Sequence, residues 1–234
     1  MRTLAVTAVE AERDAVAPRG GHILTLPGGY RLHRAHEDTG VDVLAGGVGP
    51  GAIAAATATA LAYAALQGGG SYGSPYGLVV SAGIGGGFPP LPLGATVVSD
   101  AIVAADLGAQ TADGGFAELG FGTVVHTPPK DLVRAAADAA GAVTGTVLSV
   151  STVTGTAARA RELSERHPGA AAEGMEGFGV AEAAAAYGLP ALEVRAVSNA
   201  VGPRDKAAWD IPGALTALEG AFERLAPVLR TWQP

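Results

Sequence analysis

The chain has 234 residues, of which 48% are apolar and 16% charged, and its formal net charge is -7. It contains no cysteine, which excludes disulfides, thiolate metal sites and cysteine nucleophiles. The acidic balance disfavours a nucleic-acid partner, because phosphate binding needs clustered lysine and arginine. A mean hydropathy of +0.29 and this length predict one well-buried core rather than a disordered chain.

Short strand-like runs alternate with longer alanine-rich runs, which predicts an α/β fold. The predicted strands are 3–9, the hairpin pair 22–26 and 30–36, then 41–45, 78–82, 95–105, 143–150 and 191–197. The predicted helices are 10–16 (helix or turn), 52–66, 131–140, 156–166, 177–187 and 214–229. No linker or repeat interrupts the series. We expect a single domain, 1–234, with a central mixed, mostly parallel β-sheet flanked by helices.

Neither a secretion signal nor a membrane span is expected. Met1-Arg2 leads directly into a strand-like run. The longest nearly apolar stretch, 52–66, is shorter than the roughly 20 residues that a bilayer span requires. The expected location is therefore the cytoplasm, with no membrane partner.

The segment Gly49-Pro50-Gly51-Ala52-Ile53-Ala54 fits the G-x-G-x-x-A dinucleotide motif between a strand and a helix. The acid that should end the next strand is missing, because that strand ends in Ser81-Ala82-Gly83. We therefore expect a tight turn whose backbone amides are free for another polar group, and no nicotinamide cofactor.

Metal binding and serine hydrolase chemistry have little support. His33 and His36 are three residues apart in a predicted strand, so their imidazoles would point to opposite faces. The other histidines are isolated in the sequence, and no G-x-S-x-G motif occurs. We expect neither a metal nor a cofactor.

Polar residues follow the predicted strands at the edge where ligands bind in open α/β sheets. Glu10 and Glu12 would share one face on an extended segment, whereas at a helix start they would favour the helix dipole. Met175-Glu176 lies between a predicted short strand and an alanine-rich helix, whose first turn is the alternative place for Glu176. Arg195-Ala196-Val197-Ser198-Asn199 ends a buried strand.

These segments together resemble the purine nucleoside phosphorylase and nucleosidase superfamily. The most similar branch contains the 5′-methylthioadenosine/S-adenosylhomocysteine nucleosidases and the futalosine hydrolases. The resemblance covers nearly the whole chain and is most specific where Met-Glu is followed about 20 residues later by R-A-x-S-[DN]. The matching segments are Ala8-Val9-Glu10-Ala11-Glu12, Gly47-Val48-Gly49, Ser81-Ala82-Gly83-Ile84-Gly85-Gly86, Gly174-Met175-Glu176-Gly177 and Arg195-Ala196-Val197-Ser198-Asn199.

The resemblance implies roles for the matching residues. Glu12 would be the general base that activates the attacking water, with Arg195 near the water and the acids. Met175 would pack on the ribose, and Glu176 would accept hydrogen bonds from its 2′ and 3′ hydroxyls. Ser198 would support the residue after it. We also count four more residues as substrate-binding: Gly85, Gly86, Val153 and Thr154.

Asn199 lies at the position where the adenine-specific nucleosidases have an aspartate that donates to purine N7. An amide offers two N–H donors, which suit the N7 and O6 acceptors of a 6-oxopurine such as hypoxanthine. Since an unmatched polar group costs roughly 1–3 kcal/mol, Asn199 favours an inosine-type substrate. An asparagine that only caps a turn is the alternative.

The segment after the first strand favours hydrolysis over phosphorolysis. Phosphorylases of the superfamily hold phosphate with arginines, one of them in a Gly-Asp-Pro-x-Arg loop, where this chain has Val9-Glu10-Ala11-Glu12. The extra carboxylate would repel phosphate and suits the activation of water. Ile84 departs from the methylthioadenosine enzymes, which have a serine at that position.

Hydrolysis of an inosine-like nucleoside implies futalosine, which carries a carboxyphenyl ketone on the ribose 5′ carbon, as substrate. Its cleavage would release hypoxanthine in the futalosine route to menaquinone. Segment 202–212 resembles the futalosine hydrolases, and Arg204 or Lys206 would pair with the substrate carboxylate. Trp209 or Phe178 would cover the aromatic ring. An exposed loop before the last helix is the alternative, and both interpretations stay open.

The expected partners are a nucleoside and further copies of the chain, in a homodimer or higher homo-oligomer. Three other functions remain open: a methylthioadenosine/S-adenosylhomocysteine-type nucleosidase, a phosphate-dependent purine nucleoside phosphorylase, and a non-catalytic nucleoside-binding protein.

Overall fold

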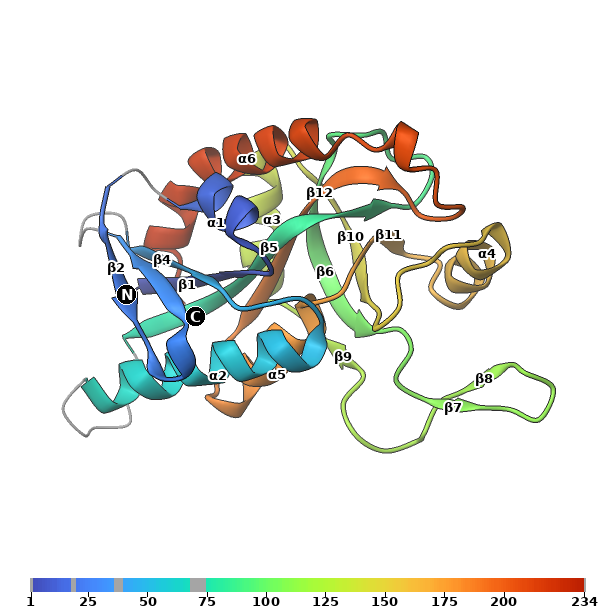
Figure 1. Cartoon of the computed structure of the whole chain (residues 1–234), viewed down its shortest axis with the longest axis horizontal. Helices are drawn as coiled ribbons and strands as arrows, with labels where there is room; N and C mark the ends of the chain where they lie inside the picture. The colour runs from blue at the N-terminus through green and yellow to red at the C-terminus, as the bar shows by residue number, and fades with distance from the viewer. Residues whose placement is uncertain (1, 18–19, 36–39, 68–74, 234) are drawn as a thin grey trace.

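The computed structural model describes residues 2–17, 20–35, 40–67 and 75–233. Within them, helices cover both faces of a mixed ten-stranded sheet (Figure 1), which confirms the predicted α/β fold class. No described helix is long and apolar enough to cross a membrane.

The strands of the large sheet are β1 (Arg2–Thr7), β2 (His22–Thr25), β3 (Arg31–Arg34), β4 (Val41–Ala45), β5 (Tyr76–Gly87), β6 (Thr96–Ala104), β9 (Val125–His126), β10 (Val143–Ser149), β11 (Ala170–Gly174) and β12 (Ala191–Ala200). A separate hairpin pairs β7 (Ala109–Gln110) with β8 (Phe116–Ala117). The helices are α1 (Glu10–Val16), α2 (Pro50–Gln67), α3 (Lys130–Ala140), α4 (Ala157–Arg166), α5 (Gly177–Ala186) and α6 (Ile211–Thr231), with short 3-10 turns η1 (Pro27–Gly29) and η2 (Lys206–Ala208).

The predicted elements recur with small shifts in their ends, and the segment 10–16 is a helix rather than a turn. The main difference is β5, which was expected to end at residue 82 and continues to Gly87. Glycines in this second half allow other chain segments to approach closely, since a Cβ on Gly85 would lie 2.5 Å from the carbonyl oxygen of Glu173. The two-residue strands β7, β8 and β9 were missed because each is too short to show an alternating pattern.

The sheet partly closes on itself. Its strand order is β11-β10-β6-β12-β5-β1-β4-β3-β2, and β11 also pairs with the far end of β5, where Ala172 faces Gly87 and Glu173 faces Gly86. The strands β5, β12, β6, β10 and β11 therefore form a closed group. This closure brings the residues that follow β11 against the ends of β5 and β12.

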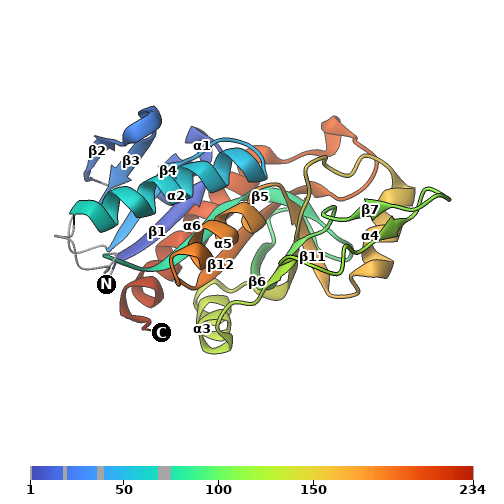
Figure 2. The same ribbon diagram turned by 90° about the horizontal axis from the view of Figure 1, so that it is seen from below.

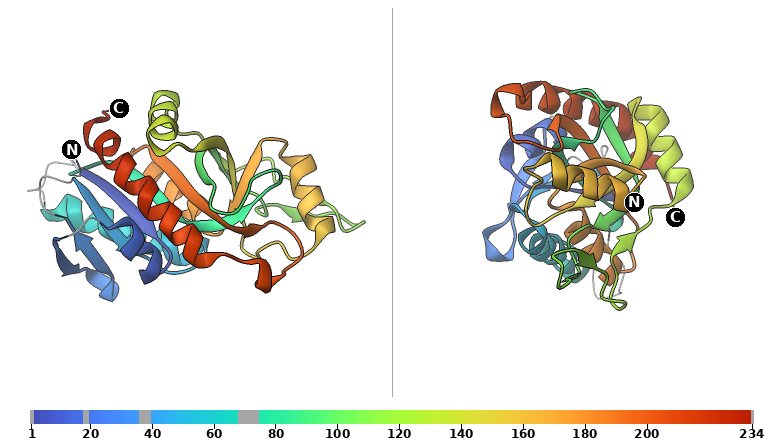
Figure 3. Two further views of the ribbon diagram at one scale, coloured as in Figure 1. Left: turned by 90° about the horizontal axis from the view of Figure 1, so that it is seen from above. Right: turned by 90° about the vertical axis from the view of Figure 1, so that its right-hand side faces the viewer.

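Five of the six described helices divide into two groups with separate cores, and α4 packs through Leu163 in a third core. Helices α2 and α5 pack on one face around Ile53, Leu61 and Val180, whereas α1, α3 and α6 pack on the other around Leu132 and Leu218. Figure 2 shows α2 and α5 side by side, and Figure 3 shows α6 running across the opposite face. Because both faces are covered, the central strands are apolar along most of their length. Polar side chains concentrate where those strands end.

Candidate active site

A cavity of about 370 Å³ opens where the loop after β1 meets the ends of β5, β11 and β12. Eleven of the predicted site residues line it: Glu12, Gly85, Gly86, Val153, Thr154, Met175, Glu176, Ser198, Asn199, Arg204 and Trp209. Arg195 lies buried behind the cavity wall, and Phe178 and Lys206 do not line the cavity. Three carboxylates line this cavity, because Glu173 joins Glu12 and Glu176.

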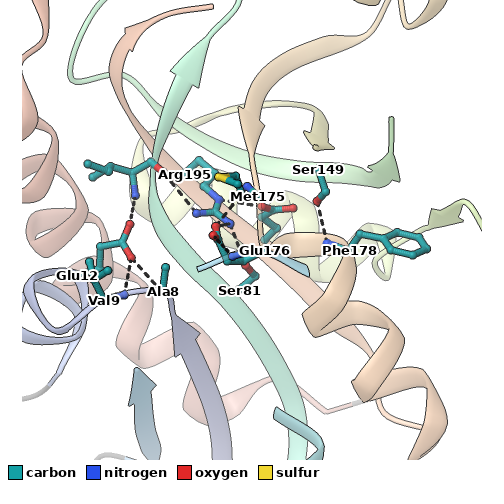
Figure 4. Close-up of polar contacts among 12 residues, drawn as sticks. Ala8, Val9, Glu12, Ser81, Ser149, Met175, Glu176, Phe178 and Arg195 are labelled. Atoms are coloured by element: carbon teal, nitrogen blue, oxygen red, sulfur yellow. Dashed lines mark hydrogen bonds and ion pairs between the residues drawn. The ribbon is translucent and has the colours of Figure 1, made fainter. Parts of the chain in front are cut away.

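Glu12 is held at the cavity wall by backbone amides. Its Oε2 accepts hydrogen bonds from the amides of Ala8 (3.0 Å) and Val9 (3.3 Å), and its Oε1 accepts one from Ile84 N at 2.9 Å (Figure 4). It is 4% exposed, and burial raises the pKa of this carboxyl while nearby Arg195 counteracts the rise. Glu12 thus caps the first turn of α1 and also faces the cavity.

Glu10 does not accompany Glu12. It is exposed on the helix surface, where it pairs with Arg13 at 3.1 Å and lies 3.7 Å from Arg31. Of the two alternatives given for these acids, the structure has the helix start, because both lie in the first turn of α1.

Arg195 is the centre of the polar network behind the cavity. It is 1% exposed, and its Nε donates to Glu193 Oε1 at 2.8 Å. Its two terminal nitrogens reach Glu176 Oε2 at 3.2 Å, Ser81 Oγ at 3.3 Å and the Ile84 carbonyl at 3.3 Å (Figure 4). Burial alone would lower the pKa of Arg195, but Glu193, Glu176 and Glu12 raise it, so the guanidinium stays charged.

Two glycines make room for this guanidinium. A Cβ on Gly83 would lie 2.5 Å from an Arg195 terminal nitrogen and 2.6 Å from Glu12 Oε1. A Cβ on Gly174 would lie 3.0 Å from the guanidinium carbon. Side chains at either position would therefore displace the arginine or separate it from Glu12. The glycine cluster that follows Ser81 serves this packing within a strand, rather than forming a loop.

Glu176 is fixed by the glycine turn before α2. Its Oε1 accepts a hydrogen bond from Gly49 N at 3.1 Å, and Gly49 has a φ of 89°, which glycine adopts without strain. The turn was predicted to offer a free amide to a polar group, and Glu176 is that group. Although Glu176 is the N-cap of α5, its side chain makes no capping hydrogen bond and instead lines the cavity.

Sequence reasoning missed Glu193. It is fully buried on β12, two residues before Arg195, so both side chains point to the same face of the strand. Burial raises the pKa of Glu193, Arg195 counteracts this, and its Oε2 has no hydrogen-bond partner among the described residues. A Cβ on Gly177 would lie 1.9 Å from that oxygen. The available signal was a glutamate in the apolar first half of the strand, two residues before the arginine.

Ser198 and Asn199 form a pair at the end of β12. Ser198 Oγ lies 2.9 Å from Asn199 Oδ1 and 3.1 Å from the Gly85 carbonyl. Since amide and carbonyl oxygens only accept, the hydroxyl supplies the proton and holds Asn199 in position. Asn199 Nδ2 donates to the Ala200 carbonyl at 3.0 Å.

The segment before α6 contributes two residues to the cavity. Arg204 and Trp209 both line it, and the Arg204 guanidinium carbon lies 5.4 Å from the Trp209 ring centre. Lys206 is exposed on η2 and does not line the cavity. The structure therefore favours Arg204 over Lys206 as a substrate contact.

Phe178 is not brought to the cavity, which corrects its assignment as a substrate contact. Its amide donates to Ser149 Oγ at 2.8 Å, and its ring packs 5.3 Å from the His126 ring. Figure 4 shows the ring pointing away from Arg195 and Met175. The first turn of α5 is oriented so that the Glu176 side chain faces the cavity and the Phe178 side chain does not.

Metal ligands do not cluster in the part of the chain that the structure describes, where no group of three His, Asp or Glu side chains could hold a metal ion. His33 lies on β3, while His36 falls outside the described residues.

Comparisons with known proteins agree with this geometry. A family model described as the phosphorylase superfamily matches residues 8–229. A futalosine hydrolase of Streptomyces coelicolor is 62% identical and covers 100% of this chain and 99% of its own length. Another futalosine hydrolase, from Acidothermus cellulolyticus, is 45% identical, with coverage of 96% and 90%.

Solved structures give the same fold. A 5′-methylthioadenosine/S-adenosylhomocysteine nucleosidase from Colwellia psychrerythraea, in complex with adenine, matches with a TM-score of 0.78 at 25% identity, covering 98% of this chain and 93% of that one. The futalosine hydrolase of Helicobacter pylori matches with a TM-score of 0.80 at 15% identity, over 97% and 98%. The chain is thus a member of the phosphorylase superfamily. Within that superfamily it belongs to the futalosine hydrolase family, as the sequence resemblance predicted.

The network around Arg195 leads to a stability prediction. Arg195→Met should reduce the free energy of unfolding by about 3–5 kcal/mol near pH 8, because Glu193 and Glu176 would be buried without their partner. Nothing would then counteract the burial that raises the pKa of Glu193, so the folded variant would bind a proton more readily than the unfolded chain. The destabilisation should therefore shrink as the pH falls toward that raised pKa.

Urea unfolding at pH 8 and pH 5.5 measures this difference. The control is Arg159→Met, which removes a solvent-exposed pair with Glu162 and should cost about 1 kcal/mol or less. An equal loss of stability for Arg195→Met at both pH values would contradict the unpaired-carboxylate explanation.

Proposed function

We propose that the protein hydrolyses the N-glycosidic bond of futalosine and releases hypoxanthine. The observation that carries this proposal is the convergence, in one cavity, of a carboxylate that can activate water, a carboxylate that can hold a ribose and an amide that can contact a purine. These groups are Glu12, Glu176 and Asn199. The relatives named futalosine hydrolase support the choice of substrate.

In the proposed reaction, the bond between ribose C1′ and purine N9 lengthens, and positive charge develops on the ribose. Glu176 accepts hydrogen bonds from the ribose hydroxyls, and its negative charge favours the cationic transition state. Glu12 takes a proton from water as the water oxygen bonds to C1′. The electron pair of the broken bond leaves with the purine, where the Asn199 amide donates a hydrogen bond to the developing anion, and the anion then takes a proton from solvent to give hypoxanthine. Arg195 keeps these acids in position by its hydrogen bond to Glu176 and its charge near Glu12.

Water is a better nucleophile for this cavity than phosphate. Glu12, Glu173 and Glu176 line the cavity, and the one cation among its lining residues is Arg204. Arg195 is already bound to Glu193 and Glu176. A phosphate dianion would therefore meet net negative charge, whereas water would not.

The pair formed by Arg204 and Trp209 supports an aromatic carboxylate at the 5′ end of the substrate. The Arg204 guanidinium can form two parallel hydrogen bonds with the carboxylate, and the indole ring of Trp209 can stack on the phenyl ring. We further propose that the chain acts as one domain, 1–234, in a cytoplasmic homo-oligomer on the route to menaquinone, as the family resemblance implies.

Incubation with futalosine, inosine or methylthioadenosine, each with and without phosphate, tests this function. Chromatography should show hypoxanthine released from futalosine at the same rate in both buffers, because water rather than phosphate attacks C1′. A requirement for phosphate would identify a phosphorylase instead. Preferred release of adenine from methylthioadenosine would identify the other nucleosidase, and binding without cleavage a non-catalytic protein.

Glu12→Gln tests the general base. The variant should fold but lose turnover by roughly 10²–10⁴-fold, since an amide cannot accept the proton from water. Glu10→Gln is the matched control, because Glu10 is exposed on the same helix and should leave kcat unchanged. A folded Glu12→Gln protein with near-normal kcat would remove Glu12 from the base role.

Asn199→Asp tests the contact with the base. A carboxylate in place of the amide would face the N7 and O6 lone pairs of hypoxanthine. The ratio of kcat/KM for futalosine to that for its 6-amino analogue should therefore fall by roughly ten-fold or more. An unchanged ratio would show that Asn199 does not select the base.

A further inference from the structure

Glu173 is a buried carboxylate in the cavity wall to which the proposed reaction gives no role. It lies on β11 and is 5% exposed. Neither Arg195 nor any other cation forms an ion pair with it among the described residues. Burial raises its pKa, and hydrogen bonds from Thr154 counteract this. Burying a carboxylate without an ion-pair partner is energetically costly, so its presence here suggests a function.

The sheet places Glu173 in the same row as Asn199. Gly86 on β5 pairs with Glu173 of β11 on one side and with Asn199 of β12 on the other. Paired residues on neighbouring strands point to the same face, and two strand spacings separate these Cα atoms by about 10 Å. A Cβ on Gly86 would lie 3.3 Å from Asn199 Nδ2. Glycine at this position therefore avoids a collision with the Asn199 amide and with the side chain of Val201, whose Cγ2 would lie 2.8 Å away.

Glu173 also changes which hydrogen-bonding groups the cavity offers. The amide of Thr154 donates to Glu173 Oε1 at 2.8 Å, and the Thr154 hydroxyl donates to Oε2. The Thr154 donors are thereby occupied within the wall. A carboxylate has about four acceptor sites, so Glu173 keeps lone pairs for a ligand. Here the cavity therefore offers a hydrogen-bond acceptor, the Glu173 carboxylate. If the Thr154 amide were free, the cavity would offer a donor instead.

The edge of a 6-oxopurine has the complementary order of groups. N7 and O6 accept hydrogen bonds, and the adjacent N1–H donates. We propose that Glu173 is a specificity-determining residue whose carboxylate accepts the N1–H of the base, while the Asn199 N–H that is not bonded to the Ala200 carbonyl donates to the edge formed by N7 and O6. Adenine has a lone pair at N1 and would face the lone pairs of Glu173. This inference rests on the proposed function, and it adds a second contact that selects hypoxanthine.

Glu173→Gln tests the proposal. The glutamine oxygen can still accept from the Thr154 amide, and its NH₂ group then offers a donor to N1. The kcat/KM ratio of futalosine to its 6-amino analogue should fall at least ten-fold relative to wild type. Glu165→Gln, an exposed change of the same chemistry on α4, should leave the ratio unchanged. Equal losses on both substrates would overturn the proposal and reduce Glu173 to a support for Thr154.

A measurement on the wild-type protein covers the case in which the variant does not fold. Hypoxanthine should inhibit futalosine cleavage at least ten-fold more strongly than 6-methoxypurine, which keeps an oxygen at position 6 but has no N1–H. Equal inhibition would overturn the role of Glu173. Failure of the proposed function gives a different result, because wild-type protein would then release no hypoxanthine from futalosine in the absence of phosphate.

Discussion

The site depends on the burial of one positive charge among several negative ones. Arg195 is removed from water, and this is tolerated because Glu193 and Glu176 pair with it and the Ile84 carbonyl and Ser81 hydroxyl oxygens accept two more of its protons. Much of the surrounding structure follows from this requirement. Gly83 and Gly174 leave space for the guanidinium, and Gly177 leaves space for Glu193. The same pairing holds Glu176, so charge compensation and the placement of the acid that we propose binds the ribose depend on one side chain.

Local sequence patterns predicted the elements well, because apolar runs and glycine or proline breaks reflect interactions within a few residues. The pairing of β11 with β5 could not be predicted in this way. It joins residues 172 and 173 to residues 87 and 86 through two register positions, and such a contact leaves no local pattern. The extension of β5 through Gly83–Gly87 was missed for a related reason. Glycines usually indicate turns, and here distant neighbours require them within a strand.

The residues of the site were predictable where they belong to a motif. Glu12, Met175-Glu176 and Ser198-Asn199 match segments of known spacing, and all of them line the cavity. Glu193 and Glu173 belong to no motif, and their importance follows from burial and from partners distant in the sequence. Phe178 shows the opposite error. Proximity to Glu176 in sequence did not place its ring in the cavity, because the two side chains leave the start of α5 in different directions.

The glycines of β5 lie at two levels along one strand. Gly83 contacts the Arg195 network, and Gly86 lies between Glu173 and Asn199, three residues or about 10 Å further along. In the proposed reaction, bond cleavage and recognition of the base thus depend on different parts of the same strand. A mutation near Gly86 can change the groups that face the base without unpairing the buried charges of the Arg195 network near Gly83. A scaffold with this separation can acquire a new nucleobase preference during evolution while it keeps its way of breaking the glycosidic bond.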